Sequence, residues 1–251
     1  MEKVAKETYR GQIMRLVDAM TRPNHQLDVA GDLVAGSNLS RVKMFVDGNL
    51  EKRFDKLQVQ LESVADVFED FESLIIEYVR DNKSAAFDNV TSDAERMLVW
   101  LAQTQSPSAE QLDMIACQRA RHEVENVGRK NRLKHIRFQE LIGLTEQFLP
   151  ELETNAQLRI HLNPIRSWSR FHTTALLDDE STTPADVLFF AVGAEIHTAV
   201  LELEGQALIN ELADFQPCTL DEWVALTMQS DRHEIMDTCR DLAEMGLVAF
   251  G

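Results

Sequence analysis

Residues 187–203 read Val-Leu-Phe-Phe-Ala-Val-Gly-Ala-Glu-Ile-His-Thr-Ala-Val-Leu-Glu-Leu, and this stretch decides the class of the fold. The apolar run at 187–192 has the length of a buried strand rather than that of a helix. Gly193-Ala-Glu195 is expected to form a hairpin turn, and residues 196–203 the returning strand. The stretch therefore predicts a β-hairpin inside an otherwise helical chain.

Three short helices are expected after the hairpin. Thr219 and Glu222 have the spacing of a capping box, which opens the second helix, and Gly246 is suited to end the third. The apolar positions that mark the three helices in turn are Leu208, Leu212 and Phe215, then Trp223, then Ile235, Cys239 and Leu242. Strands followed by three short helices describe a compact winged-helix type of α+β unit.

The chain before the hairpin reads differently. Residues 158–162 alternate between apolar and polar side chains as a strand does, whereas the stretch from Leu50 to Phe148 repeats apolar residues every three or four positions. We therefore expect a mainly α N-terminal helical domain over residues 1–152. A small α+β winged-helix domain with a three-stranded sheet is expected over residues 153–251.

Charge argues against nucleic acid as a partner. The chain of 251 residues carries a net charge of −17, and nucleic-acid binding needs a positive surface that releases counterions from phosphate. No apolar run reaches the roughly 18 residues that a membrane span needs, and the charged N-terminus lacks the apolar core of a signal peptide. Three widely spaced cysteines fit free thiols in a reducing compartment. We expect a cytoplasmic protein that binds neither nucleic acid nor membrane.

One segment runs against this acidic background. Residues 117–137 hold seven basic side chains and only two acidic ones. Such a run is either a solvated helix face or a patch that meets an acidic partner. Within it, Arg129, Lys130 and Arg132 are the predicted partner-docking residues.

No catalytic motif is present in the sequence. His122-Glu123 lacks the second histidine of a zinc-protease helix, and none of the glycine-rich phosphate-binding or nucleophile motifs occurs. The histidines and cysteines are not spaced as metal ligands. We therefore expect no catalytic residue, no metal site and no cofactor in this chain.

Two segments together resemble a known family. Residues 41–54 read Arg-Val-Lys-Met-Phe-Val-Asp-Gly-Asn-Leu-Glu-Lys-Arg-Phe, and an amphipathic stretch continues to Tyr78-Val79. This resembles the N-terminal helical domain of the partner proteins of multinuclear non-heme iron-dependent oxidative enzymes, with Phe45 at the position of the family's tyrosine. Residues 187–251 resemble the winged-helix recognition elements of ribosomally made, modified peptides.

The resemblance implies a function. A separately encoded iron enzyme of TIM-barrel type would form a heterodimer with this chain and oxidatively remodel a cysteine in a precursor or carrier peptide. This chain would be the non-catalytic subunit that holds the peptide, with the iron in the partner enzyme. Among such partners, the resemblance points to the one of 3-thiaglutamate biosynthesis, in which the enzyme excises the β-carbon of a cysteine at the C-terminus of a carrier peptide.

The peptide site is predicted from the returning strand and the last helix. Ala199, Leu201 and Leu203 share the strand face that can pack on helices, which leaves an unusually apolar opposite face. An edge strand beside a helix suits an extended peptide, whose backbone pairs with the strand. The predicted peptide-binding residues are Ile196, Thr198 and Val200 on the strand, and Arg232, Met236 and Arg240 on the helix.

Two alternatives remain open at this point. In the first, Arg232 and Arg240 simply offset the acids around them. The chain as a whole is alternatively a winged-helix DNA-binding regulator or a general scaffold protein, although the acidic residues of the last helix would repel phosphate.

Overall fold

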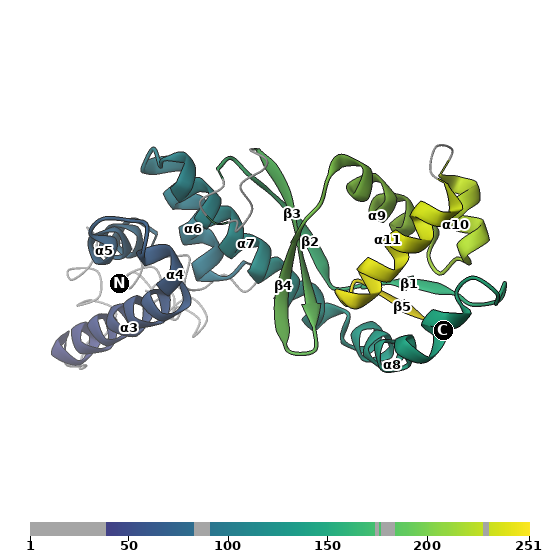
Figure 1. Ribbon diagram of the computed structural model, residues 1–251. Coiled ribbons are helices and arrows are strands. Elements are labelled where there is room, and N and C mark those ends of the chain that lie inside the picture. The colour runs from purple at the N-terminus through teal and green to yellow at the C-terminus, as the bar shows by residue number, and fades with distance from the viewer. Residues whose placement is uncertain (1–38, 83–90, 174–175, 177–183, 228–230) are drawn as a thin grey trace, which may run out of the picture. The chain divides into compact units, whose positions relative to one another are not determined.

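A computed structural model describes residues 39–82, 91–173, 176, 184–227 and 231–251 (Figure 1). Contacts divide the chain into two compact units, Met1–Pro107 and Ser108–Gly251. The boundary expected at residues 152 and 153 falls inside the second unit, because helices α7 and α8 pack against strands of that unit. In the described part of the chain, no helix has both the length and the apolar character needed to cross a membrane.

The described part of the first unit is helical. It contains α3 (Leu39–Gln60), α4 (Glu62–Ala65), α5 (Phe71–Asp81) and α6 (Asp93–Thr104). The apolar stripe expected along this segment is buried, with Leu57, Leu61, Val64, Phe68, Phe71 and Ile75 each below a tenth exposed. The chain turns at Asp70, whose φ is 52°, and Ser92 caps α6 by accepting a hydrogen bond from the Glu95 N–H.

A buried charge pair joins the helices of this unit. The Arg53 guanidinium donates to both carboxylate oxygens of Asp93, and Nη2 also donates to the Asn82 carbonyl over 2.9 Å. The Tyr78 hydroxyl donates to Asp93 Oδ1 over 2.9 Å, and the Arg53 guanidinium lies over the Tyr78 ring. Burial, together with the hydrogen bond to Asp93, raises the pKa of Tyr78 well above its usual range. The pair is satisfied on both sides, as a buried charge must be.

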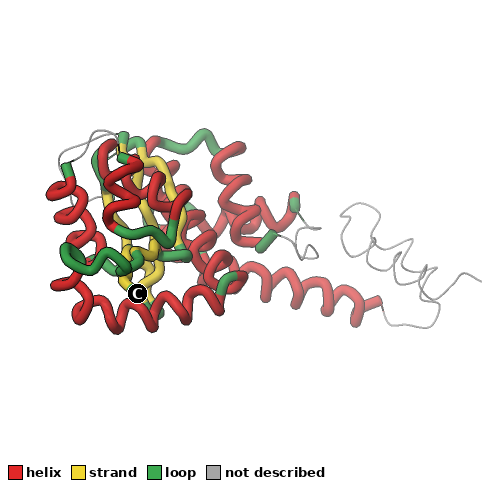
Figure 2. Tube along the Cα trace, turned by 90° about the vertical axis from the view of Figure 1, so that its right-hand side faces the viewer, coloured by secondary structure: helices red, strands yellow, loops and turns green. Residues whose placement is uncertain are grey.

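The second unit combines helices with two small sheets. Its helices are α7 (Ala109–Lys130), α8 (Arg132–Phe148), α9 (Leu203–Phe215), α10 (Leu220–Leu226) and α11 (Arg232–Glu244), with a short 3₁₀ turn at Leu149–Glu151. Strands β2 (Arg166–Phe171), β3 (Ala185–Val192) and β4 (Glu195–Val200) form an antiparallel sheet in that order, and β1 (Ile160–Leu162) pairs with β5 (Val248–Phe250). In Figure 2 the strands, drawn yellow, lie among these helices. The predicted fold class is confirmed: a mostly helical N-terminal region precedes an α+β part with a three-stranded sheet.

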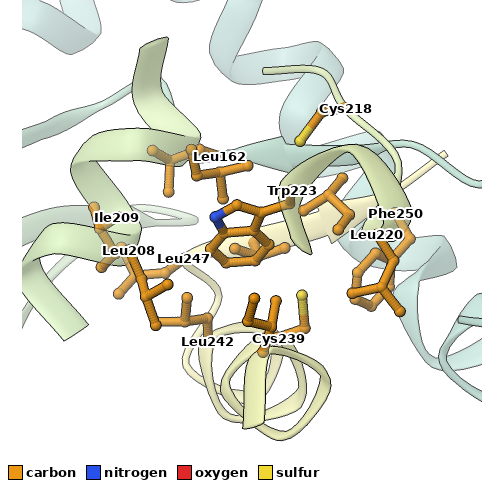
Figure 3. Packing of buried hydrophobic residues seen from close by; sticks show 14 of the residues in the cluster. Leu162, Leu208, Ile209, Cys218, Leu220, Trp223, Cys239, Leu242, Leu247 and Phe250 are labelled. Atoms are coloured by element: carbon orange, nitrogen blue, oxygen red, sulfur yellow. The ribbon is translucent and has the colours of Figure 1, made fainter. Parts of the chain in front are cut away.

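Both faces of the central strand β3 are buried in separate cores. Leu188 and Phe190 face a large core shared with α9, α10, α11 and β5, while Val187 and Phe189 face a smaller core shared with α7. Figure 3 shows Trp223 of α10 at the centre of the large core. A strand buried on both faces reads as a continuous apolar run, which explains why residues 187–192 do not alternate.

The local signals for the hairpin and for α10 are confirmed. Gly193 has a φ of 61°, the value that a type II′ turn requires at its first central position and that glycine reaches without steric cost. Thr219 and Glu222 form the predicted capping box at the start of α10. A second capping box, between Ser108 and Gln111, starts α7.

The returning strand is shorter than expected, and this corrects one assignment. β4 ends at Val200, and α9 begins at Leu203. The Leu203 side chain is 80% exposed. Leu203 therefore does not share the packed face of the strand, because the chain has already turned into a helix. Ala199 does pack into the large core, and Leu201 lies partly buried against it.

Candidate functional site

The candidate site is the free edge of β4. This strand is the last in the three-stranded sheet, and among the described residues it pairs with β3 alone. The two-residue turn fixes its register against β3, so that Phe190 lies opposite His197 and Phe189 opposite Thr198. Because both faces of β3 are packed, β4 is held against a fixed support.

The direction of the backbone groups of β3 follows from two hydrogen bonds at its end. The Ala191 N–H donates to the Ile165 carbonyl over 3.0 Å, and the Asn163 side-chain amide donates to the Ala191 carbonyl over 2.8 Å. Both bonds point away from β4, toward the segment that leads into β2. Since this direction alternates along an antiparallel strand, the N–H and C=O groups of Phe190 point toward β4.

The same alternation fixes the free groups of β4. His197 is opposite Phe190, so its backbone faces β3. The N–H and C=O groups of Ile196, Thr198 and Val200 therefore point outward from the sheet. Among the described residues, no hydrogen bond from another segment reaches these outward groups. Six backbone groups are thus arranged to pair with an added strand, and they belong to the three β4 residues that the sequence predicts as peptide-binding.

The side chains of these residues have a different role from the one predicted for them. Ile196 and Val200 lie partly buried against the smaller core, whereas Thr198 is exposed. This core thus accounts for the apolar face that the sequence left without a partner. What β4 offers at its edge is chiefly backbone.

Two exposed side chains border this edge. Glu195 and His197 point to the opposite face of β4 from Thr198. The His197 ring lies 5.9 Å from the Phe190 ring, and its Nε2 is 3.6 Å from a Glu195 carboxylate oxygen. They supply one donor or acceptor and one negative charge next to the edge.

The predicted helix residues lie on α11, which packs against α10 and β5 and shares no extensive contact with β4 in the described part of the chain. Met236 is only 3% exposed and belongs to the large core. Arg232 pairs with Asp221 of α10. Arg240 donates to Asp237 over 2.9 Å and contacts the Met236 sulfur at 3.6 Å. Both arginines are partly exposed, and their role in peptide binding stays a prediction.

The predicted docking residues lie where α7 ends and α8 begins. Arg129, Lys130 and Arg132 are all exposed, and Arg129 donates to the Asn126 side chain over 2.6 Å. Close by in the chain, the His135 ring nitrogen Nε2 lies 3.3 Å from the Gly193 carbonyl. This contact places the start of α8 next to the turn of the β3–β4 hairpin.

The buried carboxylate of Asp113 accepts a set of hydrogen bonds that the sequence did not reveal. Buried at 0% exposure on α7, it accepts hydrogen bonds from the backbone N–H groups of His172 and Thr173, both over 2.7 Å. The Thr173 hydroxyl donates to it over 2.7 Å, and His172 Nδ1 lies 3.1 Å away. Burial alone would raise the pKa of this carboxyl, but the hydrogen bonds outweigh it and hold the pKa below its usual value. The group ties the end of β2 to α7.

The thiols and possible metal ligands give no reactive centre in the described residues. Burial raises the pKa of Cys117 and raises that of Cys218 to about 11, so neither is poised as a thiolate. No group of three or more histidine, cysteine or acidic side chains able to hold a metal ion occurs among the residues that the structure describes. The expectation that the chain has no catalytic role stays a prediction.

Neither a scan against protein-family models nor a search of curated proteins finds a match for this chain.

Proposed function

We propose that this chain is a cytoplasmic, non-catalytic subunit that binds a precursor or carrier peptide along β4. It presents the cysteine of that peptide to a separately encoded, iron-dependent oxidative enzyme. In the narrower form of the proposal, the reaction is the excision of a cysteine β-carbon in 3-thiaglutamate biosynthesis.

The observation that carries the proposal is the open edge of β4. Addition of an extended peptide to a sheet edge gives affinity through main-chain hydrogen bonds, and a preformed edge reduces the ordering cost of binding. Ile196, Thr198 and Val200 offer six outward backbone groups on β4. This strand pairs with β3, which is packed on both of its faces. None of these three side chains is charged, so none opposes the approach of another strand.

The remainder of the proposal rests on the resemblance of residues 41–80 and 187–251 to the partner proteins of iron enzymes and to peptide-recognition elements. The charge of the chain fits this reading better than the DNA-binding alternative. On α11, the helix that a winged-helix regulator would place in DNA, Arg232 and Arg240 both pair with aspartates. A helix with this balance would repel phosphate.

A co-expression experiment tests the proposal. The chain is tagged and expressed together with candidate partners, namely any short cysteine-containing peptide and any metalloenzyme that its neighbouring genes encode. We expect both to co-purify with the chain, with iron in the enzyme and less than one iron atom per chain in the subunit purified alone. If the chain instead binds a DNA duplex at physiological salt and retains neither protein, the regulator becomes the better account.

A further inference from the structure

The first half of α8 carries an exposed surface in which apolar and basic side chains alternate. Leu133 is 75% exposed and Ile136 is 43% exposed. Arg132 and Arg137 are exposed as well, one turn from Ile136 and Leu133 respectively. We call Arg132, Leu133, Ile136 and Arg137 the α8 patch. It lies away from the side of the helix that carries buried Phe138 and Thr145 and packs on β5.

The two arginines of the patch form no ion pair among the described residues, a property that they share with Arg119, Arg121 and Arg129 of α7. Arg159, Arg170, Arg232 and Arg240 each pair with a carboxylate. In a chain with 42 acidic and 25 basic residues, most exposed basic side chains have an acidic side chain available for an ion pair. No ion pair within the described part of the chain involves Arg132 or Arg137.

Helix stability does not explain these residues either. The first turn of α8 contains no acidic residue, although acids there interact favourably with the helix dipole and cations do not. The N-cap Asn131 makes no side-chain capping bond to this helix. Within the described part of the chain, neither helix capping nor an ion pair accounts for the exposed Leu133 and the two arginines.

From this geometry we propose that the α8 patch is the docking site for an amphipathic helix of a separate protein. That helix carries an apolar stripe flanked by aspartates and glutamates. Leu133 and Ile136 would pack against the apolar stripe, and Arg132 and Arg137 would pair with the acids on its two sides.

Charge decides among the possible occupants. A second copy of this chain would bring its own arginines to the contact, and each copy carries a net charge of −17. An anionic membrane presents an extended surface and would meet the acidic chain well beyond the patch, whereas a single helix meets the charges of the patch alone. The inference deepens the proposed function, since it assigns the surface that a partner protein contacts, but it does not depend on the peptide.

A synthetic probe tests the patch directly. The probe is a fluorescent helical peptide of about 20 residues with leucines on one stripe and glutamates beside them. A second version replaces every glutamate by lysine. Wild-type chain should bind the acidic helix at least about tenfold more tightly than the lysine version in about 0.15 M salt, where a Debye length of about 8 Å limits the comparison to charges near the patch.

Variants locate the contact. Leu133→Ser/Ile136→Ser should weaken binding of the acidic helix about tenfold at low and high salt, because the loss is apolar. Arg132→Glu/Arg137→Glu should weaken it about tenfold at low salt and less in about 0.5 M salt. Leu203→Ser is the matched control, since Leu203 is equally exposed but lies on α9, and it should change nothing.

Three results would overturn the inference. They are equal binding of the lysine helix, an equal loss in Leu203→Ser, or binding of anionic lipid vesicles in place of the acidic helix. Circular dichroism of each variant shows that it is folded. Because neither the carrier peptide nor the enzyme takes part, failure here leaves the β4 proposal intact, and failure of that proposal leaves this result intact.

Discussion

The two edges of the three-stranded sheet differ in how they meet solvent. On β2 the outward backbone groups belong, by the same alternation, to Arg166, Trp168 and Arg170. Arg170 pairs with Asp186, and the Arg166 guanidinium donates to the Asn163 carbonyl over 2.6 Å. Charged side chains along an edge strand discourage pairing with another chain. The β4 edge has no charge at any of its outward positions.

The small sheet shows a third arrangement. The Phe250 N–H of β5 reaches the Thr145 hydroxyl of α8 over 3.4 Å, and α8 packs along that strand. One edge is thus covered by a helix and another carries arginines, while in the described part of the chain no hydrogen bond from another segment reaches the outward groups of β4 and its three outward residues are uncharged. Native proteins usually protect long edges, so such an edge is available to pair with a further strand. This contrast is the basis of the proposed peptide site.

The largest expected effect comes from breaking the attachment of β2. Asp113→Asn replaces a carboxylate that accepts four hydrogen bonds from His172 and Thr173 with an amide that cannot accept them all. Unfolding in urea should show a loss of about 2–3 kcal/mol, the range for a buried charged acceptor. Asp186→Asn is the matched control, since its pair with Arg170 is exposed, and it should cost less than about 1 kcal/mol.

This prediction has a pH dependence. The pKa of Asp113 is lowered in the folded state, so its stabilisation is present above the unfolded value of about 3.9 and is lost as the pH falls through the lowered folded pKa. The difference in unfolding free energy between wild type and Asp113→Asn should therefore shrink below about pH 4. A difference that stays constant down to pH 2 would show that the carboxylate charge has no part in holding β2.

The next effect compares the two edges directly. Thr198→Pro removes an outward N–H from β4 and leaves the ladder to β3 intact, and Arg170→Pro does the same on β2. Titration calorimetry with the cysteine-containing peptide should show at least about tenfold weaker binding, near 1.4 kcal/mol, for Thr198→Pro alone. Equal losses in the two variants would remove the distinction between the edges.

The smallest expected effect concerns α11. Arg232 and Arg240 are partly exposed and already paired, so Arg232→Glu/Arg240→Glu should weaken peptide binding by about 1 kcal/mol or less. The same titration measures it. A loss larger than that of Thr198→Pro would place the main peptide contact on the helix rather than on the strand.

Local signals made much of the fold predictable from the sequence. The hairpin at Gly193 and the capping box at Thr219 depend on a few neighbouring residues, and both are present. Strand β2 was missed because Arg166-Ser-Trp-Ser-Arg170 carries little apolar signal, and its pairing partner begins 14 residues beyond its end. Strand β5 has three residues, too few to show a period.

The sequence predicts the three β4 residues of the candidate site, but for a reason that differs from the one that the structure gives. Ile196 and Val200 are predicted because the sequence shows no partner for their side chains, whereas both pack partly against the smaller core. Their outward backbone became visible only through the bonds of Asn163 and Ile165 to Ala191, which join segments distant in sequence. Pattern reading on one helix likewise could not show that Met236 is buried by the rest of the core.

Amide hydrogen exchange tests the central claim most directly. The chain is measured residue by residue, by NMR, with and without the cysteine-containing peptide. The account predicts that the amides of Ile196, Thr198 and Val200 exchange freely in the chain alone and become protected in the complex, while those of Arg166, Trp168 and Arg170 do not change. Peptide binding that leaves the three β4 amides unprotected, or protects the β2 amides instead, would contradict it.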